Sequence, residues 1–84
     1  MTRIQLRYFA SVREALGTGG EALDTEAATL AALRDELIAR GEPYAAALAR
    51  GRAVRMALDQ VMRTEDAALH EGSVVAFFPP VTGG

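Results

Sequence analysis

The first part of the chain begins with alternating apolar and polar side chains. In residues 3–9, RIQLRYF, the side chains of Ile4, Leu6 and Tyr8 fall on one side of an extended backbone, and the polar side chains fall on the other. A period of two is typical of a strand with one buried face. A weaker alternation in residues 21–27, EALDTEA, predicts a second strand.

One segment with helical spacing lies between these two strands, and another follows them. Residues 10–17 predict a short helix, and residues 29–41 predict the main helix. The apolar stripe of the main helix consists of Leu30, Leu33, Leu37 and Ile38. We expect the Thr29 hydroxyl to cap the start of this helix, Arg40 to lie in its last turn and Gly41 to end it.

The second part returns to strand patterns after a further helical segment that begins at Pro43. Residues 52–63 alternate again, with a turn at Asp59-Gln60 and a short return at Val61-Met62. Residues 73–78, SVVAFF, are apolar on both faces. A strand of that kind usually lies in the centre of a sheet or has one face covered by a partner.

These elements predict an α+β fold in which a mixed sheet packs against one main helix, with short extra helices. The expected order is strand, strand, helix, strand, strand. We expect the first and last strands, which have the strongest patterns, to be neighbours in the sheet centre. A chain of 84 residues predicts one domain. We place this domain at residues 1–78 and an extended C-terminal tail at residues 79–84.

Composition narrows the classes of function. The formal net charge is −2 and no block of basic residues occurs, which argues against a nucleic-acid partner. The absence of cysteine excludes a disulfide scaffold, a Cys-based zinc site and a cysteine nucleophile, and it agrees with a cytoplasmic location. No apolar run approaches the roughly 20 residues of a membrane span, so we expect no membrane association. All nine basic residues are arginine, so the chain has no lysine amine that its own activated terminus could acylate.

The usual catalytic signatures are weak. The single histidine, His70, has no second ligand at metal-binding spacing, and we interpret it as a surface residue. The run GTGG, residues 17–20, lacks the following lysine of a phosphate-binding loop and is interpreted as a turn. Arg50, Arg52 and Arg55 are interpreted as a solvated face, with an acidic protein partner as the alternative. We therefore predict no metal and no bound cofactor.

The C-terminal segment is the candidate functional element. Pro79 and Pro80 cannot donate to a sheet ladder, so we expect them to end the last strand and direct the chain away from the domain. Residues 80–84 reach about 16 Å when extended, at about 3.3 Å per residue. Gly83 and Gly84 have no side chains, so this end can enter a slot too narrow for other residues. It presents one unhindered main-chain carboxylate.

Such a carboxylate becomes reactive when it is coupled to AMP. ATP converts it to an acyl-adenylate, and a sulfur donor then displaces AMP and leaves a thiocarboxylate. The thiocarboxylate is a nucleophilic sulfur atom on a peptide arm, which can visit one buried, dry site after another. On this interpretation partner enzymes supply the chemistry, and this chain supplies the reach and the reactive atom.

The same residues resemble a known family. The ending VAFFPPVTGG, residues 75–84, closely matches the C-terminal motif of the small subunits of molybdopterin synthase, which are ubiquitin-like β-grasp sulfur carriers. The segment RYFASVREALG is similar to the first strand and short helix of that family. TLAALRDEL is similar to the start of its main helix, and HEGSVVAFFPP to its last turn and strand. The resemblance covers essentially the whole chain and implies a β-grasp fold.

The resemblance also implies a reaction. Gly84, next to Gly83, would be adenylated by a ubiquitin-activating-like adenylyltransferase that uses ATP, and would then become a thiocarboxylate. The tail would enter the large synthase subunit and pass sulfur to cyclic pyranopterin monophosphate, which builds the dithiolene of molybdopterin. The implied assembly is a heterotetramer of two small and two large subunits, with the catalytic lysines on the large subunit. The implied partner-binding residues are Phe77, Phe78, Pro79, Pro80, Val81 and Thr82.

The two phenylalanines are expected to have different roles. Because Phe77 and Phe78 are adjacent in a strand, their side chains point to opposite faces. We expect one of them to lie in the core and the other to contribute to an apolar docking patch.

Other functions on the same fold stay open at this point. The chain could be a sulfur carrier for thiamine synthesis or tRNA thiolation, or a ubiquitin-like protein modifier. It could also be a β-grasp adaptor that binds a partner noncovalently. The adaptor hypothesis predicts that removal of Gly83 and Gly84 leaves function intact, whereas the carrier hypothesis predicts complete loss.

Overall fold

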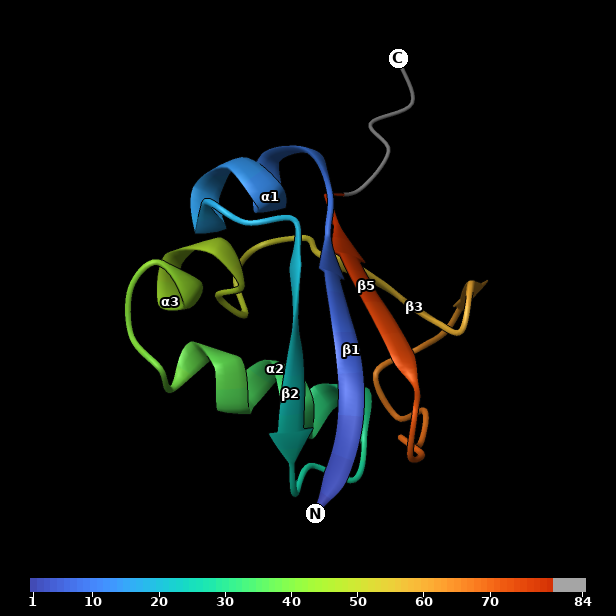
Figure 1. Cartoon of the computed structure of the whole chain (residues 1–84). Helices are drawn as coiled ribbons and strands as arrows, with labels where there is room; N and C mark the ends of the chain where they lie inside the picture. The colour runs from blue at the N-terminus through green and yellow to red at the C-terminus, as the bar shows by residue number, and fades with distance from the viewer. Residues whose placement is uncertain (80–84) are drawn as a thin grey trace.

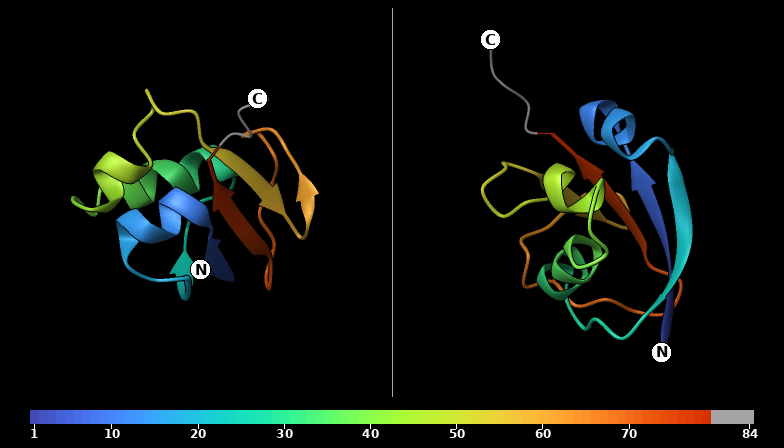
Figure 2. Two further views of the ribbon diagram at one scale, coloured as in Figure 1. Left: turned by 90° about the horizontal axis from the view of Figure 1, so that it is seen from above. Right: turned by 90° about the vertical axis from the view of Figure 1, so that its left-hand side faces the viewer.

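The fold has two layers, a mixed sheet and a set of helices on one of its faces (Figures 1 and 2). A computed structural model describes residues 1–79. The strands are β1 (Thr2–Tyr8), β2 (Gly20–Thr25), β3 (Arg55–Leu58), β4 (Val61–Met62) and β5 (Val74–Phe78). The helices are α1 (Ala10–Leu16), α2 (Leu30–Ile38) and α3 (Tyr44–Ala47). This arrangement confirms the predicted α+β class.

The sheet has the order β2-β1-β5-β3-β4. Strands β1 and β5 are parallel and the other neighbouring pairs are antiparallel. The prediction that the first and last strands are central neighbours is therefore confirmed. The predicted order contained four strands, whereas the return segment Val61–Met62 is a separate edge strand, so the sheet in residues 1–79 has five. The turn at Asp59-Gln60 connects it to β3, and both residues have positive φ, 50° and 71°.

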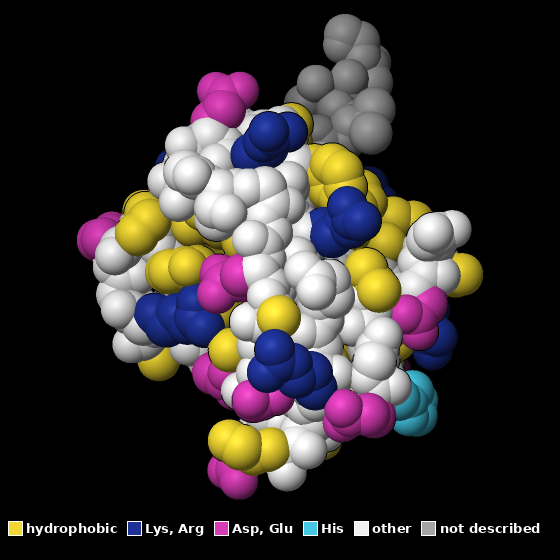
Figure 3. All heavy atoms as spheres, viewed as in Figure 1, with side chains coloured by type: hydrophobic (Ala, Val, Ile, Leu, Met, Phe, Trp, Pro, Cys, Tyr) yellow, Lys and Arg dark blue, Asp and Glu magenta, His cyan; other side chains and the backbone are white. Residues whose placement is uncertain are grey.

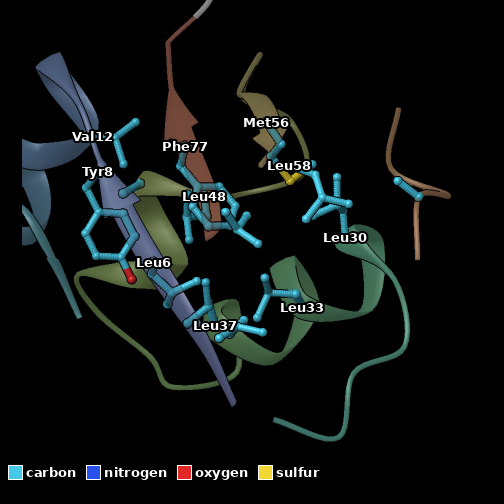
Figure 4. Close-up of a cluster of buried hydrophobic side chains, with 14 residues drawn as sticks. Leu6, Tyr8, Val12, Leu30, Leu33, Leu37, Leu48, Met56, Leu58 and Phe77 are labelled. Carbon is cyan, nitrogen blue, oxygen red and sulfur yellow. The ribbon is translucent and has the colours of Figure 1, made fainter. Parts of the chain in front are cut away.

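The core lies between the sheet and the helices (Figure 4). The predicted inward set of β1 is confirmed, because Ile4, Leu6 and Tyr8 are almost completely buried while the residues between them are exposed. From the helix side come Leu30, Leu33 and Leu37 of α2 and Leu48 after α3, each 0% exposed. The Thr29 hydroxyl caps α2 by accepting a hydrogen bond from the Ala32 N–H, 3.2 Å away, as predicted.

Strand β2 begins earlier than the alternation suggested. Gly20, which was assigned to a turn, is its first residue and pairs with Arg7 of β1. A Cβ atom at position 20 would lie 2.4 Å from the Leu6 carbonyl oxygen. The close approach of two backbones therefore requires glycine at this position.

The main helix ends earlier than predicted. Helix α2 stops at Ile38, and Arg40 lies in the turn that follows rather than in the last helical turn. There the Arg40 guanidinium binds the Glu21 carboxylate at 3.0 Å and stacks over the Tyr44 ring. This contact draws Arg40 toward the start of β2, so its partner is a side chain and not the helix dipole.

The Glu21 carboxylate joins the sheet to the helical layer. It accepts hydrogen bonds from the hydroxyls of Tyr8, at 3.0 Å, and Tyr44, at 2.8 Å, in addition to the contact with Arg40. Partial burial alone would raise the pKa of Glu21, but the hydrogen bonds from Arg40, Tyr44 and Tyr8 outweigh it and hold that pKa below its usual value. Burial, together with the Glu21 carboxylate, raises the pKa of the Tyr8 hydroxyl.

A buried arginine organises the loop before β3. Arg34 of α2 is 3% exposed, and its guanidinium donates to the backbone carbonyls of Leu48, Ala49 and Arg52 at 2.8, 2.7 and 2.9 Å. Glu65 lies 3.5 Å from the same guanidinium and also pairs with Arg50. The loop is thus held on α2, and its position determines where β3 enters the sheet beside β5.

Candidate functional site

Strand β5 is the element that leads to the C-terminal segment. It lies between β1 and β3, and its last residue, Phe78, is followed by Pro79, the last residue that the structure describes. Figure 1 shows that β1 and β5 run in the same direction and that the chain leaves β5 at the opposite end of the sheet from the N-terminus. The predicted site residues Pro80, Val81, Thr82, Gly83 and Gly84 lie outside the described residues.

The two phenylalanines at the end of β5 separate as expected. Phe77 is 0% exposed and packs in the core, with its ring 6.0 Å from that of Tyr8. Phe78 points to the other face of the sheet and is partly exposed. Phe77 was included among the predicted partner-binding residues, and that role stays a prediction; in the isolated chain the core encloses its side chain. Phe78 is the aromatic residue on the open face.

Phe78 has an aromatic neighbour on the open face. The ring of Phe9, which follows β1, lies edge-on to the Phe78 ring with 6.3 Å between the centroids, and Phe9 is 46% exposed. The Phe9 N–H donates to the Phe77 carbonyl at 3.0 Å, which fixes the end of β1 against the end of β5. Phe9 was not among the predicted site residues, although its position after the outward residues 3, 5 and 7 continues their alternation.

These two rings belong to a larger apolar surface. On the open face, Ala76 of β5 lies between Arg7 of β1 and Ala57 of β3, and Ala57 in turn pairs with Met62 of β4. Residues directly opposite each other in neighbouring strands project to the same face. We call the resulting surface the sheet-face patch. It consists of Phe9, Met62, Val74, Ala76 and Phe78, together with Ala57, which projects to the same face but is only 7% exposed.

The sheet-face patch is visible as a group of apolar side chains near the end of β5 (Figure 3). The small residue Ala76 and the half-buried Val74 line a hollow whose rim includes Arg7, Phe9 and the turn at Asp59-Gln60. The Asp59 carboxylate accepts a hydrogen bond from the Val74 N–H at 2.9 Å. A large exposed aromatic next to a hollow is typical of a protein-binding surface.

Two arginines border the sheet-face patch on opposite sides. Arg7 pairs with Ala76 from β1, and Arg55 pairs with Phe78 from β3. The predicted face of Arg50, Arg52 and Arg55 does not form as a unit, because Arg50 pairs with Asp35 and Glu65 near α2. The basic residues beside the patch are instead Arg7 and Arg55.

The other candidate sites add little. His70 is exposed in the loop before β5, as predicted. In residues 1–79 no group of three or more His, Cys, Asp and Glu side chains gathers to hold a metal ion. Within the same residues, none of the helices has the length and apolar character needed to cross a membrane. The end of β5 and the sheet-face patch therefore form the candidate site.

Comparison with known proteins identifies the family of this chain. The model of the ThiS family matches residues 6–84, which include the whole C-terminal motif. The chain belongs to the ThiS family. It is 40% identical over 81 residues to the molybdopterin synthase sulfur carrier subunit of Escherichia coli, covering 96% of this chain and 99% of that protein. The subunit of the same description from Haemophilus influenzae is 36% identical over 81 residues, with the same coverage.

Solved structures share the fold of this ThiS family member. A putative molybdopterin converting factor subunit 1 from Pyrococcus furiosus superposes with a TM-score of 0.78 at 25% identity, covering 96% of this chain and 100% of that chain. A protein-protein complex of subunits 1 and 2 of the molybdopterin-converting factor from Helicobacter pylori contains a chain that matches with a TM-score of 0.65 at 23% identity. That match covers 99% of this chain and 100% of the other. The likeness confirms the predicted β-grasp fold.

These relatives also confirm the predicted function as a sulfur carrier. The two curated proteins are both sulfur carrier subunits, and they align with this ThiS family member over nearly its full length. The predictions for the individual tail residues and for the thiocarboxylate remain predictions.

Proposed function

We propose that this chain is the sulfur-carrying subunit of a molybdopterin synthase and that its reactive atom is a sulfur on the carboxyl carbon of Gly84. The proposal rests mainly on one observation: the central strand β5 leads directly into the segment that ends in Gly83-Gly84. Strand β5 is fixed on both sides by β1 and β3, and Pro79 follows directly. A rigid strand is a good base for an arm that must reach into another protein.

The chemistry proceeds in three balanced steps. The Gly84 carboxylate attacks the α-phosphorus of ATP, which forms the acyl-adenylate and releases pyrophosphate. A donor that delivers sulfur at the oxidation level of sulfide then attacks the carbonyl carbon, the bond to AMP breaks and AMP leaves, so that one oxygen is replaced by sulfur. In the last step the thiocarboxylate sulfur displaces an oxygen from a carbon of cyclic pyranopterin monophosphate, which breaks that C–O bond. Water then cleaves the resulting thioester, so the sulfur stays on the pterin and the Gly84 carboxylate is restored. Repeated transfer builds the two sulfurs of the dithiolene.

The carrier needs two protein partners for these steps. A ubiquitin-activating-like adenylyltransferase supplies the adenylation and holds ATP, so the chain itself needs no bound cofactor. The large synthase subunit supplies the transfer site and its catalytic lysines, in a heterotetramer of two small and two large subunits located in the cytoplasm. The Helicobacter pylori complex, in which a chain of the same fold occurs with a second subunit, supports a partner of this kind.

We further propose that the sheet-face patch is where the large subunit docks. Phe78 belongs to the patch and is joined to Pro79, so a protein bound over the patch lies next to the start of the tail. Docking there orients the tail before it enters the partner's site. The aromatic pair Phe9 and Phe78 supplies the kind of anchor that carries most of the binding energy in protein interfaces.

The proposal is tested by intact-mass analysis after incubation with ATP, the adenylyltransferase and a sulfur source. We expect a mass gain equal to the replacement of one oxygen by sulfur, located at Gly84 by fragmentation. A variant that lacks Gly83 and Gly84 is expected to fold normally, because the removed residues follow the last strand, but to gain no sulfur. A shortened variant that still supports molybdopterin formation would disprove the proposal and favour a noncovalent adaptor.

A further inference from the structure

We propose that the surface of the partner that covers the sheet-face patch carries carboxylates opposite Arg7 and Arg55. The inference deepens the docking proposed above and depends on it. It concerns the charge of the partner rather than the position of the contact.

The first observation is the placement of the two guanidinium groups. Arg7 of β1 lies opposite Ala76 of β5, and Arg55 of β3 lies opposite Phe78 of β5. The two arginines therefore border the patch from the two strands that flank β5. They project to the same open face as Phe78. Figure 3 shows basic side chains directly beside the apolar group near the end of β5.

The second observation is that these arginines have no acidic partner in the described part of the chain. Within residues 1–79 the ion pairs engage Arg3, Arg34, Arg40 and Arg50, and neither Arg7 nor Arg55 takes part in one. Two acidic side chains near the open face are already engaged. Asp24 pairs with Arg3, and the Asp59 carboxylate binds the Val74 N–H. The border of the patch thus carries two positive charges, on Arg7 and Arg55, and one negative charge, on Asp59, so it is net positive although the whole chain carries a net charge of −2.

The third step concerns the cost of covering this surface. A partner that buries Phe9 and Phe78 removes water from the neighbouring guanidinium groups. An arginine that loses water without gaining an acceptor opposes binding, whereas one that meets a carboxylate gains charge-assisted hydrogen bonds. Charges at the rim of an interface act mainly on the rate of association and on the choice of partner. A partner surface with acidic residues around an apolar centre therefore fits this patch, whereas a partner surface with basic residues there is repelled.

The test measures association of the full-length carrier with the large synthase subunit by stopped-flow fluorescence. We expect R7E and R55E each to lower the association rate constant about tenfold or more at low salt, with a smaller change in the dissociation rate. The difference from the unchanged carrier should shrink near 1 M salt, where the Debye length falls to about 3 Å. The matched control is R52E, which makes the same change of charge at an exposed arginine beside α1 and α3.

The outcomes separate this inference from the docking proposal. If R7E and R55E associate at the rate of R52E while F78A loses affinity, the docking surface stands and the acidic partner is disproved. If F78A also binds normally, or if the unchanged carrier does not bind the large subunit, the docking surface itself is disproved. Circular dichroism of each variant checks that the fold is retained.

Discussion

Val75 and Phe77 project from one face of β5 and are fully buried, whereas Val74, Ala76 and Phe78 project from the other face and remain partly exposed. The two faces have almost the same apolar composition. One is covered by the helices of the same chain, and within residues 1–79 the other has no such layer (Figure 2). This strand is therefore apolar for two separate reasons. Its inner face stabilises the domain, and its outer face is available to a partner.

The largest difference between the faces should appear in paired alanine substitutions. Phe77→Ala leaves a cavity in a close-packed core, and we expect it to lower the free energy of unfolding by about 3–5 kcal/mol. Phe78→Ala removes a partly exposed ring and should cost about 1 kcal/mol or less. A small domain has only about 5–15 kcal/mol of total stability, so the first variant should be close to unfolding at ambient temperature.

Urea denaturation of both variants measures the difference in their free energies of unfolding. Binding of each variant to the large subunit measures the contribution of the outer face to docking. Phe78→Ala should bind weakly although it is folded. Equal losses of stability for the two variants would show that the outer face also serves the fold, and would contradict the division of roles within β5.

The second prediction is that the stability of the fold depends on pH through Glu21, which lies between the sheet and the helices. The pKa of Glu21 is lowered in the folded state by its hydrogen bonds from Arg40, Tyr44 and Tyr8, against the opposing effect of burial. A carboxyl group of this kind stabilises the fold fully above its unfolded-state pKa, near 4.5, and the contribution is lost as the pH falls toward the lower folded-state value.

We therefore expect Glu21→Gln to be less stable than the unchanged chain at neutral pH but to lose less stability on acidification. Urea titrations between about pH 3 and pH 7 test this expectation, and the two curves should converge at the acid end. Parallel curves for the two proteins would show that Glu21 does not couple the fold to pH.

The sequence predicted the helices and strands well. It did not predict which face of a strand is buried where both faces are apolar. In β1 the alternation of Ile4, Leu6 and Tyr8 with polar residues determines which side is buried, and the structure agrees. In β5 no such contrast exists, so the choice between Phe77 and Phe78 depends on the register with β1 and β3. Register is set by contacts between distant segments, and local periodicity does not contain it.

The buried network around Arg34 shows a different kind of omission. Position 34 falls beside Leu30, Leu33 and Leu37 on the inner side of α2, but no role was predicted for the arginine there. Its acceptors are backbone carbonyls of the loop after α3, which no side-chain pattern indicates. The candidate function, by contrast, was predictable from the sequence. It depends on the chemistry of a few consecutive residues at the end of the chain and not on contacts between distant segments.

The smallest expected effect lies at the junction between the two faces. Ala10 follows Phe9 and has a positive φ of 51°, a left-handed conformation that costs an alanine roughly 1–2 kcal/mol. Glycine removes this strain but adds roughly 0.4–1 kcal/mol of conformational entropy to the unfolded chain. We expect Ala10→Gly to stabilise the domain by about 0.5 kcal/mol, measured by urea denaturation.

The neighbouring exposed residue of α1 provides the control for this prediction. Ser11 is not among the residues with positive φ, so Ser11→Gly should destabilise the domain by about 0.5 kcal/mol. Ala10→Gly should also loosen the link that holds Phe9 against Phe78, and so slightly weaken binding to the large subunit while the fold gains stability. Opposite signs for stability and binding would show that the strain at Ala10 serves the outer face. A loss of stability in Ala10→Gly as large as that in Ser11→Gly would mean that the backbone at Ala10 stores no such strain.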